Sequence, residues 1–184
     1  MKSFKIGVIS DTHVPDISPK ISDEFLATLK AEQFDLILHA GDISVQSVIS
    51  LLETIAPVKV VRGNRDFLLY KKVPLVQQFE VFGVKFALMH GHINFMVYWL
   101  DKFQHIINGY NRERYIHRLP KEAPDAKVIV FGHTHHAENF WQDGILYFNP
   151  GSITYGDPAT RRRTWGIIEV YEDGRVSGTI IPCD

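Results

Sequence analysis

The stretch FKIGVISDTH (residues 4–13) decides the fold, because an apolar run passes directly into polar residues. Residues 4–10 are rich in β-branched side chains, contain glycine and carry no charge at their centre, which is typical of a strand buried on both faces. Asp11 and His13 follow at once. The stretch therefore predicts a parallel sheet whose strands end in ligand-binding residues.

Strands and helices alternate along the first 63 residues. Ser18-Pro19 predicts an N-cap and first helical position for an amphipathic helix that runs to about residue 32. DLILHA (35–40) predicts a second buried strand, Ser44 the N-cap of a second helix, and VKVVRG (58–63) a third strand. This order is typical of parallel βαβ units with right-handed crossovers.

The second half of the chain changes to hairpins. QQFEVFGVKFALMH (77–90) predicts two strands joined at a glycine, and NFWQDGILYFNP (139–150) predicts a type I′ hairpin at Asp143-Gly144. TWGIIEVYEDGRVSGTII (164–181) repeats that design around Asp173-Gly174. The chain is therefore expected to begin as α/β and to end as antiparallel hairpins.

Residues 92–119 form an aromatic stretch at helical spacing, interrupted by Asn108-Gly109. They predict two short helices. Their aromatic side chains suit a core, a contact between two copies of the chain, or a wall beside the substrate. One predicted partner is therefore a second copy of the chain, bound through this stretch in a homo-oligomer.

Bulk composition narrows the function classes. A chain of 184 residues with a net charge of −1 is expected to form one domain, and neither a nucleic-acid polymer nor a membrane surface is an expected partner. The run Arg161–Arg163 fits either solvated surface or a phosphate contact. The single cysteine, Cys183, and the absence of a signal peptide or long apolar run predict a cytoplasmic protein.

Five consecutive predicted strands end in aspartate, histidine or asparagine, four of them beside a glycine. These residues are Asp11, His13, Asp42, Asn64, His90, His133 and His135. Because the carboxyl ends of the strands share one edge in an α/β sheet, we expect the seven side chains to meet there. Glycine beside a ligand lets the backbone turn sharply and approach closely.

The chemistry of this set points to divalent metal. Carboxylate, imidazole and amide ligands without cysteine suit Mn²⁺, Fe²⁺, Zn²⁺, Co²⁺ or Ni²⁺. Seven ligands are too many for one ion and fit two ions that share a bridging carboxylate. Two such ions clamp the attacking and leaving oxygens of a phosphoryl group.

The ordered motifs DTH, GD, GN, HGH and GHTH resemble the calcineurin-like metallophosphoesterase superfamily. GHTHHAE and LYFNPGS resemble its small bacterial and archaeal phosphodiesterase branch, which includes a catalytically degenerate relative, the retromer subunit. The resemblance implies an α/β sandwich of four layers, with two mixed β-sheets face to face, flanking helices, and metals at the strand C-terminal edge. One domain would span residues 1–184, with a helical insertion at about 92–119.

Carried over residue by residue, the resemblance assigns the ligands to two divalent ions, with Mn²⁺ as the preferred candidate. Asp11, His13 and His135 would hold one ion. Asn64, His90 and His133 would hold the other, and Asp42 would bridge both. Asp42, Asn64, Arg65 and His90 are the predicted catalytic residues.

The resemblance also implies hydrolysis of a small phosphate ester by in-line attack of a hydroxide between the two ions. The family's histidine after GN is absent, and Arg65 stands there, which pairs with phosphate oxygens but cannot donate a proton. Arg65, His92 and His136 are the substrate-binding candidates. The alternatives are a phosphomonoesterase or nucleotidase at the same site, and a non-catalytic scaffold with this fold.

Three further polar residues have supporting interpretations. His39 lies inside a predicted strand and is expected to be a hydrogen-bonded core histidine. Asn149 and Ser152, in NPGS, are expected to hydrogen-bond to the ligand loops.

Overall fold

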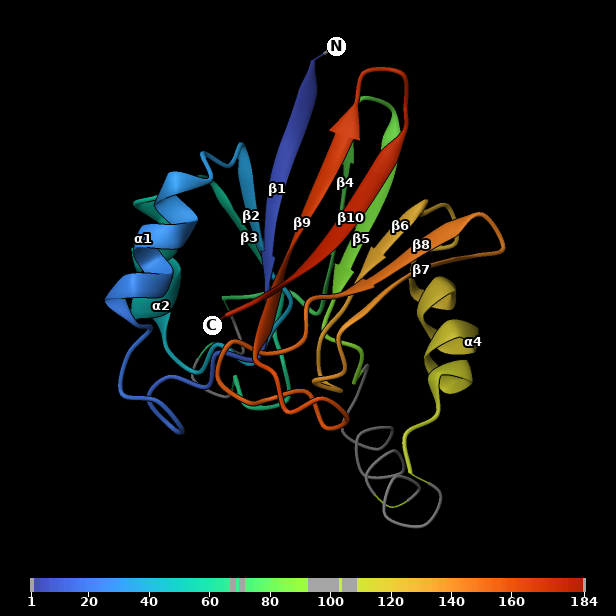
Figure 1. The fold of residues 1–184 in the computed structure, drawn as a ribbon. Coiled ribbons are helices and arrows are strands. Elements are labelled where there is room, and N and C mark those ends of the chain that lie inside the picture. Colours follow the sequence, from blue (N-terminus) through green and yellow to red (C-terminus); the bar gives the residue numbers. More distant parts are fainter. Residues whose placement is uncertain (1, 67–68, 70–71, 93–102, 104–108, 184) are drawn as a thin grey trace.

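The computed structural model describes residues 2–66, 69, 72–92, 103 and 109–183. Two five-stranded sheets pack face to face (Figure 1). The first has the order β10-β9-β1-β2-β3 and the second β4-β5-β6-β8-β7. The first sheet comprises β1 (Ser3–Ile9), β2 (Leu36–His39), β3 (Val58–Val60), β9 (Thr164–Tyr171) and β10 (Val176–Pro182). The second comprises β4 (Val76–Val81), β5 (Val84–Met89), β6 (Val128–Val130), β7 (Glu138–Gln142) and β8 (Ile145–Asn149).

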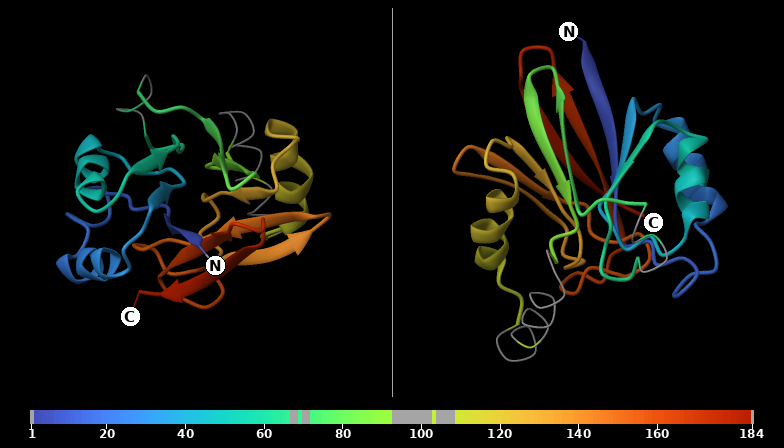
Figure 2. Two further views of the ribbon diagram at one scale, coloured as in Figure 1. Left: turned by 90° about the horizontal axis from the view of Figure 1, so that it is seen from above. Right: turned by 180° about the vertical axis from the view of Figure 1, so that it is seen from behind.

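Helices cover the outer faces of both sheets. Helices α1 (Asp23–Ala31) and α2 (Gln46–Glu53) lie against the first sheet, and α4 (Arg112–Glu122) lies against the second (Figure 2). The resulting order of helix, sheet, sheet and helix confirms the predicted α/β sandwich. Among the described residues, no helix is long and apolar enough to cross a membrane.

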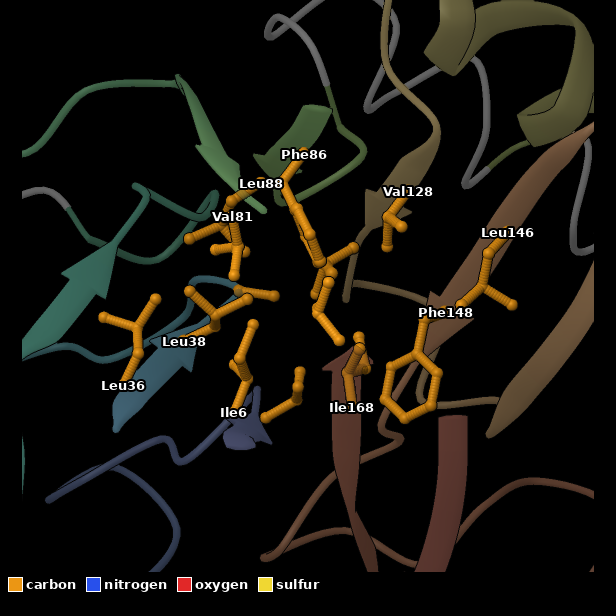
Figure 3. Packing of buried hydrophobic residues seen from close by; sticks show 14 of the residues in the cluster. Ile6, Leu36, Leu38, Val81, Phe86, Leu88, Val128, Leu146, Phe148 and Ile168 are labelled. Atoms are coloured by element: carbon orange, nitrogen blue, oxygen red, sulfur yellow. The ribbon is translucent and has the colours of Figure 1, made fainter. Parts of the chain in front are cut away.

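Alternation along each strand assigns side chains to different layers. Leu36 and Leu38 of β2 join the core between the sheets, whereas Ile37 points into the core beneath α1 and α2. Val128 of β6 joins the central core in the same way (Figure 3), as does Val130. Because both faces are covered, Leu36–Leu38 of β2 and Val128–Val130 of β6 are consecutive apolar residues.

Strand pairing confirms the parallel strands predicted for the first half of the chain. In the second half it adds parallel pairs to the predicted hairpins. Strands β1, β2 and β3 are parallel, while β9 and β10 are antiparallel additions to the same sheet. The three hairpins form as expected, but β5, β6 and β8 are parallel to one another. The two predicted mixed sheets are therefore confirmed, and the parallel pairing is added to the predicted hairpins, because local turn signals do not report crossovers between distant strands.

Both predicted helix caps were wrong. Ser22, rather than Ser18, caps α1, since its Oγ accepts a hydrogen bond from the Phe25 amide at 3.2 Å. Helix α2 begins after Val45, and no side chain caps it. The Ser44 hydroxyl instead donates to Asp16 across the loop. The Ser18 hydroxyl donates locally to Lys20 O and that of Ser44 donates across the loop, so competing hydrogen bonds displaced both expected caps.

The turns follow their sequences with one difference. Asp143-Gly144 has φ of 51° and 76°, as a type I′ turn requires. In the last hairpin, strand pairing stops at Val170 and Val176, and only Gly174 has positive φ. This turn is therefore longer than predicted.

One of the two helices predicted within residues 92–119 is described. Helix α4 begins after the Asn111 cap and ends at Glu122. The other falls within 93–102 and 104–108, outside the described residues.

Candidate metal centre

Five loops bring the predicted ligands together, although these residues span positions 11 to 135 of the chain. Each loop follows the carboxyl end of a strand: β1, β2, β3, β5 or β6. The loops lie at the end of the sheets away from the N-terminus (Figure 1). The loops of the two sheets lie beside one another, because Asp11 after β1 is 3.2 Å from His135 after β6, and Asp42 after β2 is 3.5 Å from His90 after β5.

Asp11, His13 and His135 form the first group of ligands. Their candidate ligand atoms all lie within 4.8 Å of one another. Asp11 Oδ1 is 3.2 Å from His135 Nε2 and 3.7 Å from His13 Nε2. One carboxylate and two imidazoles therefore converge around one small volume.

Asn64, His90 and His133 form the second group. Asn64 Oδ1 is 3.1 Å from His90 Nε2 and 3.0 Å from His133 Nδ1. Asp42 lies between the groups, because its Oδ1 is 3.5 Å from His90 Nε2 and its Oδ2 is 3.9 Å from His13 Nε2. This is the placement expected of a bridging carboxylate.

The backbone at the ligands is strained. Five of the seven predicted ligand residues have left-handed φ: Asp11 (54°), His13 (47°), Asp42 (55°), His133 (73°) and His135 (58°). A non-glycine residue held in this region costs on the order of 1 kcal/mol or more, and such strain clusters at functional sites. The fold therefore maintains side-chain positions that the local backbone disfavours.

Two glycines permit the close approach of ligands. A Cβ atom at Gly63 would lie 2.1 Å from Asp42 Oδ1, and one at Gly41 would lie 2.6 Å from His90 Nδ1. Gly41 also has φ of 95°. Any larger residue at either position would displace a ligand.

Asp66 is a functional residue that the sequence interpretation missed. It is 1% exposed, and its carboxylate accepts hydrogen bonds from four backbone amides at 2.6–3.0 Å. The donors are Gly63, Asp42, Ile43 and Ser44. Asp66 thus binds the Asp42 loop to the Asn64 loop. Its one signal in the sequence is an aspartate after GNR, and an exposed turn would look the same.

The predicted supporting residues behave as expected. Asn149 Nδ2 donates to Gly132 O at 3.1 Å, and Ser152 Oγ donates to Asp11 O at 2.8 Å. His39 is fully buried and hydrogen-bonded to Thr12 and to the Gly41 amide. These contacts tie the ligand loops to one another.

Burial sets the charge of the ligands. It lowers the pKa of His13 to about 4 and the pKa of His133 well below its usual value, so both imidazoles are neutral at pH 7. Burial also raises the pKa of Asp42 to about 6, against the opposing effect of His90. The pKa of His90 rises because the Asp42 and Asp11 carboxylates outweigh its burial. The neutral imidazoles of His13 and His133 are in the protonation state that binds metal, whereas the raised pKa values of Asp42 and His90 favour their protonated forms, whose protons metal binding would release.

The residues fit a divalent cation. Asp11 Oδ1 and both ring nitrogens of His13 are buried with no hydrogen-bond partner in the described part of the chain. Buried polar atoms without partners are costly and rare in folded proteins. Because these atoms belong to a carboxylate and imidazole cluster, a metal of intermediate hardness would satisfy them.

The three substrate-binding candidates have different surroundings. Arg65 is exposed, and its backbone amide donates to Asp42 Oδ1 at 2.8 Å. His92 is buried with its ring 5.3 Å from that of His90. The His136 ring stacks on Tyr110 at 4.1 Å rather than on a ligand residue.

Known proteins share the architecture of the chain. A probable metallophosphoesterase from Methanothermobacter thermautotrophicus is 35% identical over 149 residues, which cover 81% of this chain and 77% of that protein. Vps29 from Entamoeba histolytica, solved in complex with Zn²⁺, has a TM-score of 0.72 at 24% identity and covers 98% and 100% of the two chains. A structure reported as a novel archaeal phosphodiesterase has a TM-score of 0.63 at 22% identity and covers 97% and 100%.

The family assignment rests on the sequence as well as on the fold. Residues 4–173 match the calcineurin-like phosphoesterase superfamily domain, and this range contains all five ligand loops. The relative from M. thermautotrophicus supports the same assignment at the level of whole sequences. The chain therefore belongs to the calcineurin-like phosphoesterase superfamily.

Proposed function

We propose that the protein is a phosphodiesterase that uses two divalent metal ions, preferably Mn²⁺, to hydrolyse a small phosphate ester. The position of the Asp42 carboxylate supports this most directly, because its two oxygens face different groups of ligands. A single-ion site has no need of a carboxylate between two sets of imidazoles. The similarity to an archaeal phosphodiesterase fits the same proposal.

The residues of the chain have separate roles in this proposal. Asp11, His13 and His135 would hold one ion, and Asn64, His90 and His133 the other, with Asp42 shared. When bound, the ions supply an activated water and offset negative charge on the phosphoryl oxygens. His90 is held by a hydrogen bond between its Nδ1 and Ala40 O at 2.6 Å, which leaves Nε2 directed to Asn64.

The residue after Asn64 bears on the substrate class. Arg65 cannot protonate a leaving group, so the site favours esters whose leaving group departs without a proton. Aryl esters and some diesters meet this condition better than alkyl monoesters. The proposed substrate is therefore a small diester, and p-nitrophenyl esters are suitable probes.

Removal of metal tests the proposal. We expect the chelated protein to lose hydrolysis of bis-(p-nitrophenyl) phosphate, and Mn²⁺ to restore it with about two equivalents bound per chain. Elemental analysis after dialysis and a stopped-time p-nitrophenol assay measure both quantities. Full activity in the chelated protein, or saturation at one equivalent, would contradict a two-metal phosphodiesterase.

Replacement of Arg65 tests substrate binding. Arg65→Met keeps the length of the side chain and its backbone donor to Asp42 but removes the guanidinium that would pair with phosphate oxygens. We expect KM for bis-(p-nitrophenyl) phosphate to rise about tenfold, with the melting temperature unchanged, since a charge-assisted hydrogen bond contributes roughly 1.5–3 kcal/mol. Arg175→Met, at a distant exposed turn, is the control. An unchanged KM would remove Arg65 from the substrate site.

A non-catalytic scaffold is the second candidate, since Vps29 shares the fold and covers nearly the whole chain. The presence of all seven predicted ligands on five loops favours the enzyme, because backbone strain at buried carboxylates and imidazoles is typical of a functional site. Metal binding without hydrolysis of either bis-(p-nitrophenyl) phosphate or p-nitrophenyl phosphate would favour the scaffold. Faster hydrolysis of the monoester would favour a phosphomonoesterase.

A further inference from the structure

The two halves of the metal centre orient their histidines differently. In the second group, His90 is fixed by a hydrogen bond between Nδ1 and Ala40 O at 2.6 Å. In the first group, neither ring nitrogen of His13 has a hydrogen-bond partner within the described residues. Metal-binding histidines are normally oriented by a hydrogen bond on the nitrogen that does not bind the metal. Ring contacts position His13 instead: one is with His135, with centroids 5.6 Å apart, and another is with a residue outside the predicted ligand set.

Tyr155 makes that contact. Its ring meets the His13 ring edge to face, with centroids 5.1 Å apart and an interplanar angle of 82°. It also stacks on His135, with centroids 4.9 Å apart and an angle of 16°. Both distances fall in the range of favourable aromatic pairs. One tyrosine thus packs against both imidazoles of the first group.

The backbone of Tyr155 is itself attached to the ligand loop. Its amide donates to Ser152 Oγ at 2.9 Å, and Ser152 Oγ donates to Asp11 O at 2.8 Å. Thr154 Oγ1 donates to Thr12 O at 2.7 Å. The loop that carries Tyr155 is therefore joined directly to the loop that carries Asp11 and His13.

Within the described residues, the ring contacts of Tyr155 do not reach the second group. In that part of the chain, the rings of His90 and His133 contact each other and His92, with centroids 5.1–6.3 Å apart. The contacts of Tyr155 are with His13 and His135. A change at Tyr155 should consequently affect one half of the centre more than the other.

We propose that Tyr155 is a positioning residue for the Asp11–His13–His135 group, where its ring packing against His13 replaces a hydrogen bond of the kind that orients His90 in the second group. This inference rests on the proposed two-metal function. Removal of the ring leaves His13 with its ring contact to His135 alone and lowers the affinity of one of the two metal positions. The hydroxyl of Tyr155 has no part in this role.

Mn²⁺ titration of the metal-free protein by calorimetry tests the inference. For Tyr155→Leu, we expect one of the two binding steps to weaken about 10–100-fold, the range found when residues that support metal ligands are replaced. The other step should keep its wild-type affinity. Tyr155→Phe, which retains the ring, should bind both ions like the wild type. Tyr171→Leu is the matched control, because Tyr171 lies on β9 and packs against Arg175.

Electron paramagnetic resonance gives a second readout that does not depend on activity. When Mn²⁺ is added in an amount that fills the tight position but not the weakened one, Tyr155→Leu should show isolated Mn²⁺ rather than a spin-coupled pair. Two unchanged binding steps in Tyr155→Leu would overturn the inference, as would equal weakening of both steps or a Tyr155→Phe variant that behaves like Tyr155→Leu. A wild-type protein that binds fewer than two ions would instead overturn the proposed function, so the two failures are distinguishable.

Discussion

The Asp42→Asn variant is expected to lose hydrolysis of bis-(p-nitrophenyl) phosphate by on the order of 10³-fold in kcat/KM, the scale seen when a preorganised charge-stabilising group is removed. Asparagine keeps the size of the side chain, and its oxygen still accepts the Arg65 amide that now donates to Asp42 Oδ1 at 2.8 Å. The negative charge shared by the two ligand groups is lost. Steady-state kinetics with saturating Mn²⁺ measure the effect.

The same variant should be more stable than the wild type when metal is absent. Burial raises the pKa of Asp42 to about 6, above its ordinary value of 3.8, so the protonated carboxyl is favoured in the folded state. The stability associated with this group is therefore present below pH 4 and lost as the pH rises through 6. At pH 8 we expect metal-free Asp42→Asn to gain on the order of 1 kcal/mol in free energy of unfolding. His90 offsets part of the gain, because it loses the carboxylate that raises its pKa.

Urea unfolding of the metal-free wild type and of Asp42→Asn at pH 4 and pH 8 measures the free energy of unfolding independently of catalysis. The difference between the proteins should be small at pH 4 and should appear at pH 8. Asp125→Asn is the control, since Asp125 is exposed and makes a long ion pair of 3.5 Å with Lys85. Activity within tenfold of wild type, or a less stable variant at pH 8, would contradict the role assigned to Asp42.

The Asp66→Ala variant is expected to lose about 4 kcal/mol of stability, near the upper end of single substitutions, because several buried amides lose their acceptor at once. The carboxylate accepts hydrogen bonds from four backbone amides, and the side chain is 1% exposed. Alanine leaves these donors without a partner inside the protein. Since they belong to the Gly63 and Asp42 loops, the variant should also bind Mn²⁺ more weakly.

Urea unfolding of the metal-free protein at pH 7 measures the loss of stability, and titration with Mn²⁺ measures the loss of affinity. Asp66→Asn retains one acceptor oxygen and should fall between the wild type and Asp66→Ala. Asp125→Ala should change the free energy of unfolding by less than about 0.5 kcal/mol, as is usual for exposed sites. If Asp66→Ala unfolds within 1 kcal/mol of the wild type, the buried hydrogen bonds are not what holds these loops.

Much of the fold could be predicted because its signals are local. The runs at 4–10 and 35–40 carry apolar residues on both faces of their central positions, Ile6–Ile9 and Leu36–Leu38, which is sufficient to predict strands covered on both faces. Asp143-Gly144 was sufficient for a type I′ turn. The parallel pairing of β6 with β5 and β8 was not predictable in this way, since these strands are far apart in the sequence and no single turn connects them.

Helix starts show the limit of local signals most clearly. Ser18-Pro19 and Ser44 have the composition of N-caps, yet Ser22 caps α1 and no side chain caps α2. Ser44 has φ of 72° and donates to Asp16, so its side chain is used within a loop rather than at a helix end. A capping residue is chosen by which competing hydrogen bond the folded loop provides.

The sequence by itself determined the chemical identity of the candidate metal centre, because donor type and position after each strand are written in the order of the residues. Only the tertiary structure decided how that set is held. The left-handed backbone at Asp11 and Asp42, the amides gathered by Asp66 and the ring of Tyr155 all involve segments far apart in the chain. Such contacts depend on strand order and loop approach, and no local pattern encodes them, because their energies arise only once the two sheets have packed.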